Sequence, residues 1–264
     1  MLTLRDLSIT FNEGTPDEKK ALQQINLELE RGEFVTVIGS NGAGKSTLMN
    51  IISGSLFPDV GDVLIDGKQV VHLPEYKRAT LIGRVFQDPM AGTAPSMTIE
   101  ENLAIAYSRN KRRRLRRGVT KARKALFRHH LETLNLGLEN RLTAKVGLLS
   151  GGERQALSLL MATFTQPNIL LLDEHTAALD PSRAELITNL TEKVVRESEL
   201  TTLMVTHNMQ QALDLGTRLI MMDAGKIIFD VSGEEKERLT IEDLLAEFQR
   251  VRGAQFESDR SILG

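Results

Sequence analysis

The stretch GSNGAGKST, from Gly39 to Thr47, decides the fold of this chain. It matches the phosphate-binding pattern G-x-x-x-x-G-K-[S/T] and lies between the β-branched run FVTVIG and the helical pattern LMNIISG, the context that such a loop requires. Backbone N–H groups of the loop surround a β-phosphate, and the helix N-terminus adds partial positive charge. The sequence therefore predicts a nucleoside triphosphate site formed by Gly39, Ser40, Asn41, Gly42, Ala43, Gly44, Lys45, Ser46 and Thr47.

Polar side chains that suit phosphate and metal chemistry follow three other apolar runs. Asp173 and Glu174 end NILLLDE; Asp173 is predicted to hold Mg²⁺ with the Ser46 hydroxyl, and Glu174 to polarise an attacking water. His207 ends TTLMVTH, where it is placed to bind the γ-phosphate and orient that water. Gln87, in VFQDP, is a candidate ligand of Mg²⁺ or water. Each residue alone has an ordinary structural explanation. Beside a phosphate loop, however, the residues together favour a role in phosphate and metal chemistry.

The pattern of apolar residues predicts an α/β fold. Buried parallel strands are expected at 34–39, 168–173, 201–206 and 218–223, with helical patterns between them. The N-terminal third alternates as antiparallel strands do, with a bulge at Arg5-Asp6 and a hairpin turn at Asp66-Gly67. Residues 97–165 show no convincing strand and predict an inserted helical lobe. The fold class is therefore a P-loop NTPase (RecA-like) core with an N-terminal antiparallel β subdomain and an inserted helical subdomain.

Composition excludes several other classes of protein. The 264 residues carry a net charge of −2 and no cysteine, so bulk charge does not favour nucleic acid, and disulfides and thiolate metal sites are excluded. No run of about 18 apolar residues occurs, and the start, MLTLRDLSIT, lacks the apolar segment of a signal peptide. From Leu239 onward, a Thr240/Asp243 pair and apolar Leu244, Leu245, Phe248 and Val251 predict a helix that packs on its own domain.

A second helix start also favours an anion. Ser150, Gly151 and Gly152, in LLSGGERQALSLL, precede a helical pattern whose apolar residues suit burial. One chain thus carries two phosphate-seeking helix ends, about a hundred residues apart.

Taken in order, these motifs resemble the nucleotide-binding subunits of ATP-binding cassette (ABC) proteins, over about residues 1–230. GSNGAGKST resembles the Walker A motif, Gln87 the Q-loop, LSGGERQ (149–155) the signature, ILLLDE the Walker B motif with its catalytic glutamate, AALD (177–180) the D-loop and His207 the switch histidine. Phe11 lies where the family places an aromatic ring on adenine. The interpretation of Phe11 as an ordinary strand residue is nearly as good. His175 departs from the usual proline after the Walker B glutamate, and we expect it to add freedom and a titratable ring without loss of activity.

The resemblance also implies an assembly. In this family two subunits pair head to tail, so that Ser150, Gly151 and Gly152 cap the ATP of a neighbour. It implies one ABC ATPase domain over residues 1–250, with the catalytic core and β subdomain in 1–86 and 156–230, the helical subdomain in 87–155, and a helical tail over 231–264.

Two functions remain open from the sequence. The first is the ATPase subunit of a transporter, energising uptake of a small, amino-acid-like solute. It implies ATP and Mg²⁺, transmembrane permease subunits, a homodimer, a separate solute-binding protein, no nucleic acid, and a peripheral place on the cytoplasmic face of the membrane. The second is a soluble single-cassette ATPase, for example of cluster assembly. TIEENLAIA (98–106) resembles the transporter type and favours the first.

The basic segment 109–128 contains eleven Lys or Arg and no acidic residue. A solvated helix face explains it about as well as contact with anionic lipid headgroups does. Nucleic acid is a third explanation, which the lack of interleaved aromatics weakens.

Overall fold

A computed structural model of the chain describes residues 1–111 and 118–250. Its centre is a six-stranded sheet in the order β10-β9-β3-β8-β7-β6. The five strands from β9 to β6 run parallel, and β10, which the sequence reasoning missed, is an antiparallel edge strand. Their bounds are β3 (Phe34–Gly39), β6 (Ile82–Val85), β7 (Ile169–Asp173), β8 (Thr201–Val205), β9 (Arg218–Asp223) and β10 (Lys226–Ser232).

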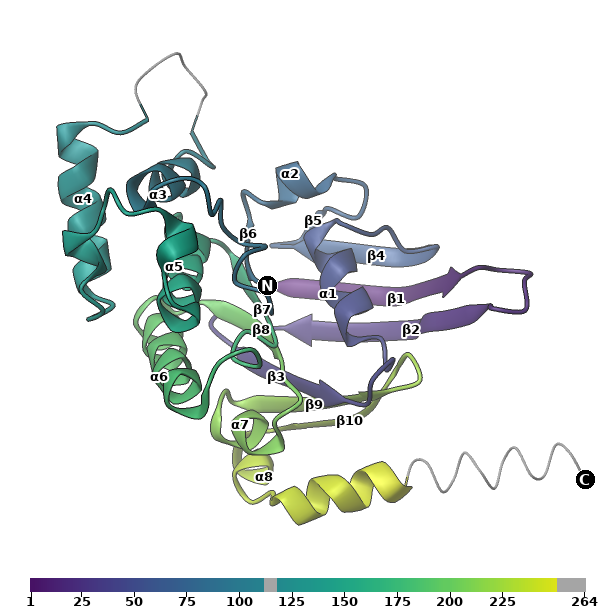
Figure 1. Cartoon of the computed structure of the whole chain (residues 1–264). Coiled ribbons are helices and arrows are strands. Elements are labelled where there is room, and N and C mark those ends of the chain that lie inside the picture. Colours follow the sequence, from purple (N-terminus) through teal and green to yellow (C-terminus); the bar gives the residue numbers. More distant parts are fainter. Residues whose placement is uncertain (112–117, 251–264) are drawn as a thin grey trace, which may run out of the picture.

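A four-stranded antiparallel sheet, in the order β2-β1-β4-β5, forms the predicted N-terminal β subdomain (Figure 1). The pairing of β1 with β2 shifts between Leu4 and Leu7, which confirms the predicted bulge. Asp66 (φ 48°) and Gly67 (φ 73°) are both left-handed, as a two-residue hairpin turn requires. The strands are β1 (Leu2–Phe11), β2 (Lys19–Leu29), β4 (Val60–Ile65) and β5 (Lys68–Gln69).

Helix α1 (Lys45–Ser53) packs in one apolar core with residues of both sheets, including Leu22 of β2 and Val37 of β3. Its C-terminal carbonyls are held by the fully buried Arg78, at the end of α2 (Glu75–Arg78), which donates hydrogen bonds to the backbone oxygens of Ile51 and Ile52. The phosphate loop that precedes α1 therefore ends on a fixed helix.

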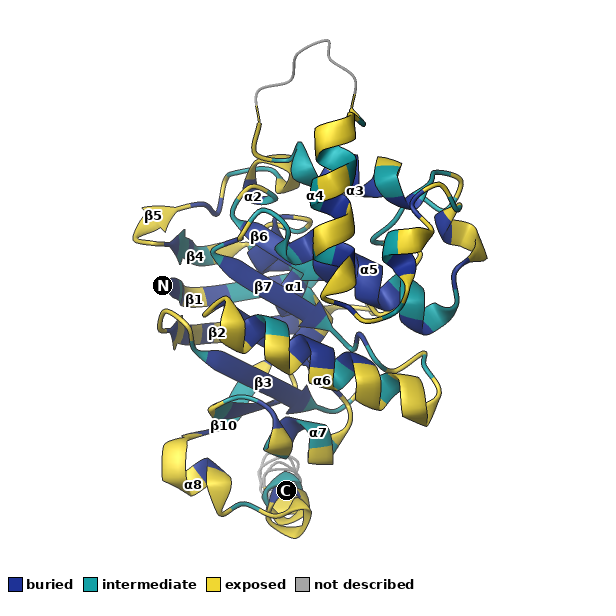
Figure 2. Cartoon of the chain, turned by 90° about the vertical axis from the view of Figure 1, so that its left-hand side faces the viewer, coloured by how far each residue is buried: buried dark blue, intermediate teal, exposed yellow. Residues whose placement is uncertain are grey.

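The other face of the six-stranded sheet carries the helical region. Helices α3 (Ile99–Tyr107), α4 (Lys121–Glu132), α5 (Gly151–Thr163) and α6 (Pro181–Glu197) share a second apolar core with β7. In Figure 2, β3 and β7 are dark blue along most of their length, and α6 lies in front with an exposed outer face. Among the described residues of 97–165 there is no strand, only an isolated bridge between Thr98 and Lys145, which confirms the predicted helical insertion.

Leu244 lies in a third apolar cluster with residues of β9, β10 and α7 (Met209–Asp214). It belongs to a helix over 241–250, which follows α8 (Gly233–Glu237) and begins at the predicted Thr240/Asp243 cap. Leu244 is fully buried and Phe248 packs beside it, as expected, whereas Leu245 is 46% exposed. Val251 lies outside the described residues, and so do residues 112–117 of the basic segment. No helix among the described residues is long and apolar enough to cross a membrane.

Candidate nucleotide site

The phosphate loop lines a pocket of about 310 Å³ at the C-terminal edge of β3. Two glycines permit this geometry, because side chains at their positions would collide with backbone. A Cβ at Gly39 would lie 2.3 Å from the Met222 carbonyl oxygen, and one at Gly44 (φ 102°) would lie 2.5 Å from that of Ala21. The lining residues are Phe11, Lys19, Ala21, Asn41, Gly42, Ala43, Gly44, Lys45, Ser46, Thr47 and Glu174; Gly39 and Ser40 are not among them.

Lys45 is the buried cation of the loop. Its Nζ donates hydrogen bonds to the carbonyl oxygens of Gly39 (2.7 Å) and Ser40 (3.0 Å), which hold the ammonium inside the curve of the loop. Burial lowers the pKa of Lys45, while the carboxylates of Glu174 and Asp173 act in the opposite direction. The loop thus contains a fixed positive charge with acidic groups facing it.

Glu174 and His207 meet at the rim of this pocket, although 33 residues separate them in sequence. His207 Nδ1 lies 3.3 Å from Glu174 Oε2, and the Glu174 side chain is 22% exposed. The Glu174 backbone is left-handed (φ 42°), and its N–H donates to the Val205 carbonyl of β8 at 2.9 Å. A non-glycine residue in that conformation is strained, and such strain gathers at functional sites.

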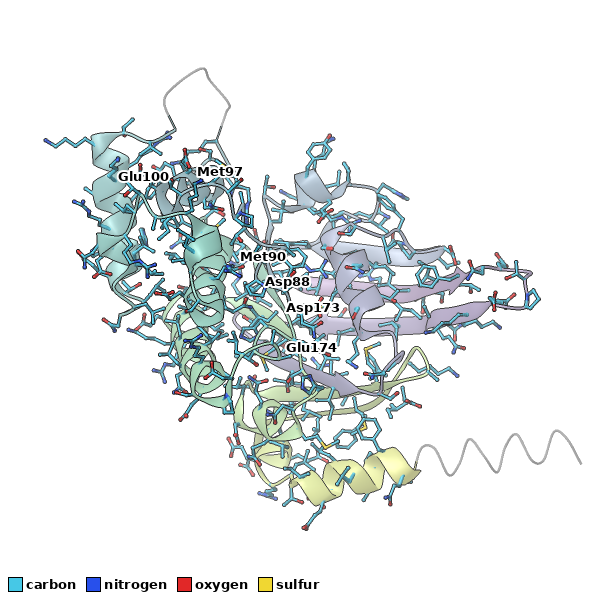
Figure 3. The ribbon with its side chains drawn as sticks, viewed as in Figure 1. Asp88, Met90, Met97, Glu100, Asp173 and Glu174 are labelled. Carbon is cyan, nitrogen blue, oxygen red and sulfur yellow. The ribbon has the colours of Figure 1, made fainter. Side chains whose placement is uncertain are left out.

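Asp173 is held by Arg84 of β6, a residue that the sequence analysis did not single out. Arg84 Nη2 lies 3.0 Å from Asp173 Oδ2 in a pair that is mostly shielded from solvent. The same guanidinium donates from Nη1 to Asn50 Oδ1 (2.8 Å) and Ser53 Oγ (3.2 Å) of α1. Figure 3 shows Asp173 and Glu174 side by side where the sheets meet the helical region.

A second residue missed from the sequence, Gln211 of α7, ties the loops that follow β7 and β8. Its Oε1 accepts a hydrogen bond from Thr206 Oγ1 (2.8 Å), and its Nε2 donates to Thr188 Oγ1 (2.9 Å) and Thr176 Oγ1 (3.3 Å). Thr206 Oγ1 in turn accepts from the backbone N–H of Asn208 at 3.1 Å. These bonds fix Thr206 and Asn208, the neighbours of His207 on either side in the sequence. No sequence pattern marked either Gln211 or Arg84.

Other predicted residues lie apart from the pocket on this chain. Gln87 is exposed and is not among the lining residues. Ser150 caps α5: its Oγ accepts from the Glu153 N–H (3.3 Å), and its own N–H donates to Glu153 Oε2 (2.7 Å). Ser150, Gly151 and Gly152 do not line the phosphate-loop pocket, so the two anion-seeking helix ends do not meet within one chain. Phe11 lines the pocket and is half-buried.

His175 contradicts the expectation that it loosens its loop. The side chain is 2% exposed, and its Nε2 lies 3.0 Å from Thr191 Oγ1. Thr191 already donates its hydroxyl proton to the Ile187 carbonyl (2.7 Å), so Nε2–H of His175 is the donor between them. Burial lowers the pKa of His175 from 6.5 to about 4, and the ring is therefore a neutral anchor to α6.

This buried histidine predicts a pH-dependent stability. Between pH 6.5, the unfolded pKa, and about 4, the folded pKa, the unfolded chain binds more protons. The contribution of His175 to the free energy of unfolding is therefore fully present above about pH 6.5 and is lost as the pH falls toward 4. Wild type should lose about 2 kcal/mol between pH 7 and pH 5 through this group. The variant His175→Gln keeps a hydrogen-bond donor but does not titrate. Over the same pH range its free energy of unfolding, measured in urea, should therefore fall by about 2 kcal/mol less than that of wild type. An identical pH profile for the two proteins would contradict this prediction.

The donor set also fits a magnesium ion. The described residues contain no cluster of three or more His, Cys, Asp or Glu side chains that would form an all-protein metal site. Mg²⁺ does not need one, since it commonly binds through one or two oxygen ligands, water and substrate phosphates. The exposed hydroxyl of Ser46 and the carboxylate of Asp173 are hard oxygen donors of that kind.

A phosphate loop after β3, an acidic pair after β7 and a histidine after β8 define a P-loop nucleoside triphosphatase. Residues 22–177 match the family described as "ABC transporter", and the chain belongs to that family. It binds and hydrolyses ATP as the ATPase subunit of a transporter. The predicted function, ATP-driven transport of the uptake type, is confirmed against the alternative of a soluble single-cassette ATPase.

Relatives and solved structures agree over nearly the whole chain. A tyrosine transport ATP-binding protein of Clostridioides difficile is 46% identical over 249 residues, 94% of this chain and 99% of the relative. A xylose/arabinose import ATP-binding protein of Sulfolobus acidocaldarius is 33% identical, covering 94% of each. A dimeric ATP-binding cassette in a post-hydrolysis state, bound to ADP and Pi, has a TM-score of 0.75 at 30% identity, over 88% of this chain and 98% of that chain. The predicted fold is thereby confirmed.

Proposed function

We propose that this chain hydrolyses ATP·Mg²⁺ between two copies of itself and thereby drives uptake of an amino-acid-like solute, with tyrosine the first candidate. The approach of His207 to Glu174 at 3.3 Å beside the phosphate loop carries the hydrolytic part of the proposal. The tyrosine transport relative, 46% identical over almost its full length, supports the choice of solute.

Each site residue has a proposed role. Lys45 and the backbone of residues 39–47 bind the β- and γ-phosphates, and Phe11 packs on the adenine. Ser46, Asp173 and Gln87 are the ligands of Mg²⁺, directly or through water, which offsets phosphate charge when bound. Glu174 accepts a proton from the attacking water and His207 holds that water and the γ-phosphate, so both need the order that Gln211 and His175 give their loops.

The proposed second copy supplies the other half of the site. Ser150 already uses its N–H on Glu153, so the N–H groups free to approach a phosphate at this helix end are those of Gly151 and Gly152. A related solved cassette is described as dimeric. In the proposed division of the domain, residues 87–155 bear this signature, and residues 1–86 with 156–230 hold ATP; α5 spans the boundary at 155 and ties one part to the other.

The membrane partner is proposed to bind between the core and the helical region. Met90 is exposed there, and Figure 3 shows Asp88 and Met90 on the segment that leads from β6 to Met97 and to Glu100 of α3. Gln155 of the signature helix donates to the Phe86 carbonyl at 3.1 Å, so this segment is joined to α5. We place the chain at the cytoplasmic face of the membrane, with permease subunits and a separate solute-binding protein as its partners.

Reconstitution with its membrane partners tests the solute. The tagged chain is purified from detergent-solubilised membranes, and the proteins that co-purify are placed with it in proteoliposomes. Tyrosine, presented with a co-encoded solute-binding protein, should raise ATP hydrolysis several-fold, and xylose should not. Stimulation by xylose but not tyrosine would overturn the solute assignment, and the absence of any membrane protein in the purified fraction would overturn the transport assembly.

A further inference from the structure

Among the described residues, Arg84 alone forms an ion pair with Asp173, and Lys45 acts on the same carboxylate from farther away. Both side chains are shielded, with exposures of 12% for Arg84 and 16% for Asp173. Removing one partner of a shielded ion pair destabilises a protein more than removing one partner of a surface pair, because the remaining charge is poorly solvated. Arg84 is therefore not an ordinary surface arginine.

Four groups fix the position of this guanidinium. Nη1 bonds Asn50 and Ser53 of α1, Nη2 bonds Asp173 at the end of β7, and the cation lies 4.7 Å from the centre of the Phe86 ring. The Arg84 Nε is buried with no acceptor among the described residues, so the neutral acceptors around Arg84 do not use all the N–H donors of its guanidinium. Its charge is met by Asp173.

The pairing uses one side of the carboxylate. Arg84 binds Oδ2, while Oδ1 accepts no hydrogen bond from the described residues. Oδ1 is therefore available to water or to a cation. Any Mg²⁺ that approaches it meets a carboxylate whose charge is already shared with a fixed guanidinium, and the two cations repel each other across it.

We propose that Arg84 is a positioning residue and built-in counter-cation of Asp173, which holds that carboxylate in place before nucleotide binds and weakens the grip of the site on Mg²⁺·ADP. The inference rests on the proposed metal role of Asp173. It implies that the protein needs no metal to keep this carboxylate ordered, and that the metal–product complex is released more readily than an unpaired carboxylate would allow.

The charge effect is tested with two matched variants. Arg84→Gln keeps hydrogen-bond donors but removes the charge, whereas Arg84→Lys keeps the charge. Mn²⁺ binding is followed by electron paramagnetic resonance with saturating ADP. The Mn²⁺ dissociation constant should fall about tenfold in Arg84→Gln, because a repulsion across a poorly screened site is removed, and should change less than about twofold in Arg84→Lys. Equal or weaker Mn²⁺ binding in Arg84→Gln would overturn the proposal.

A second measurement needs no metal. In the nucleotide-free protein, Arg84→Gln should lower the melting temperature by several degrees, and adding Asp173→Asn should restore most of that loss, since the uncompensated charge is then gone. Additive losses would overturn the counter-cation role. If Asp173→Asn alone leaves Mn²⁺ binding intact, the proposed metal role of Asp173 fails instead, and this stability cycle still decides whether Arg84 compensates Asp173.

Discussion

Replacing Lys45 with alanine is expected to abolish ATP turnover and to weaken nucleotide binding. The Lys45 ammonium is buried within the phosphate loop, 2.7 Å from the Gly39 carbonyl, and no other cation lies so deep in the curve of the loop among the described residues. A cation that faces developing phosphate charge in a shielded site contributes at least about a hundredfold in rate. Phosphate release by Lys45→Ala should therefore fall to the background of the assay.

The control for this variant is Lys226→Ala, which removes an exposed lysine of β10 outside the pocket. It should hydrolyse ATP at the wild-type rate. Because Lys45 also bonds two loop carbonyls, circular dichroism and thermal unfolding of Lys45→Ala must show a folded protein before its rate is interpreted. A folded Lys45→Ala that hydrolyses ATP at a near-normal rate would contradict the assigned role.

The sequence predicts the phosphate loop so well because its determinants are local. Gly39 and Gly44 are needed because a side-chain carbon at either position would lie within 2.5 Å of a backbone oxygen, and Lys45 and Ser46 follow at fixed positions. The parallel strands are equally legible, because burial on both faces leaves continuous apolar runs such as FVTVIG. Carboxyl ends of parallel strands share one edge, and this rule brings Glu174 and His207 together without any knowledge of side chains.

Polar contacts between distant segments produce no comparable pattern in the sequence. Arg84 and Asp173 are 89 residues apart, and neither a spacing nor a periodicity links them. Gln211 lies on a short helix where a glutamine has no special meaning until the structure sets it among Thr176, Thr188 and Thr206. His175 was misjudged for the same reason, since its partner Thr191 is on another element. Strand β10 was missed because its residues are only partly buried.

Ser150, Gly151 and Gly152 belong to a third case. The sequence marks them as a phosphate-seeking helix end, and the structure confirms that Ser150 caps α5, yet they lie outside the pocket of their own chain. Neither one sequence nor one chain contains the missing neighbour. The proposal that they complete the site of a second copy therefore requires an experiment on the assembly.

Glu174→Gln is expected to bind ATP, to lose at least about a hundredfold in hydrolysis, and to accumulate as a dimer with ATP·Mg²⁺. The amide keeps the shape of the carboxylate but accepts no proton from water, and the proposed metal ligand Asp173 is unchanged. Losing a negative charge beside the γ-phosphate also removes a repulsion that opposes the closed pair. Light scattering after gel filtration, with and without ATP·Mg²⁺, measures the dimer.

Adding Ser150→Arg to Glu174→Gln is expected to abolish this dimer. The larger side chain stands at the N-terminus of α5, where the proposed approach of a neighbour's phosphate leaves no room for it, and the serine cap on the Glu153 N–H is lost as well. ATP binding at the chain's own phosphate loop should be unchanged, because Ser150 does not line that pocket.

Ser232→Arg in the same Glu174→Gln background is the matched control, since Ser232 is an exposed serine that precedes α8 and makes no side-chain cap. That double variant should still dimerise with ATP·Mg²⁺. The decisive comparison is between two proteins that differ only in the site of an added arginine. Dimerisation of the Ser150→Arg double variant to the same extent would mean that the signature end of α5 does not cap ATP. A difference between the two, with equal ATP affinity, would locate the second phosphate-seeking helix end in the active site of the partner.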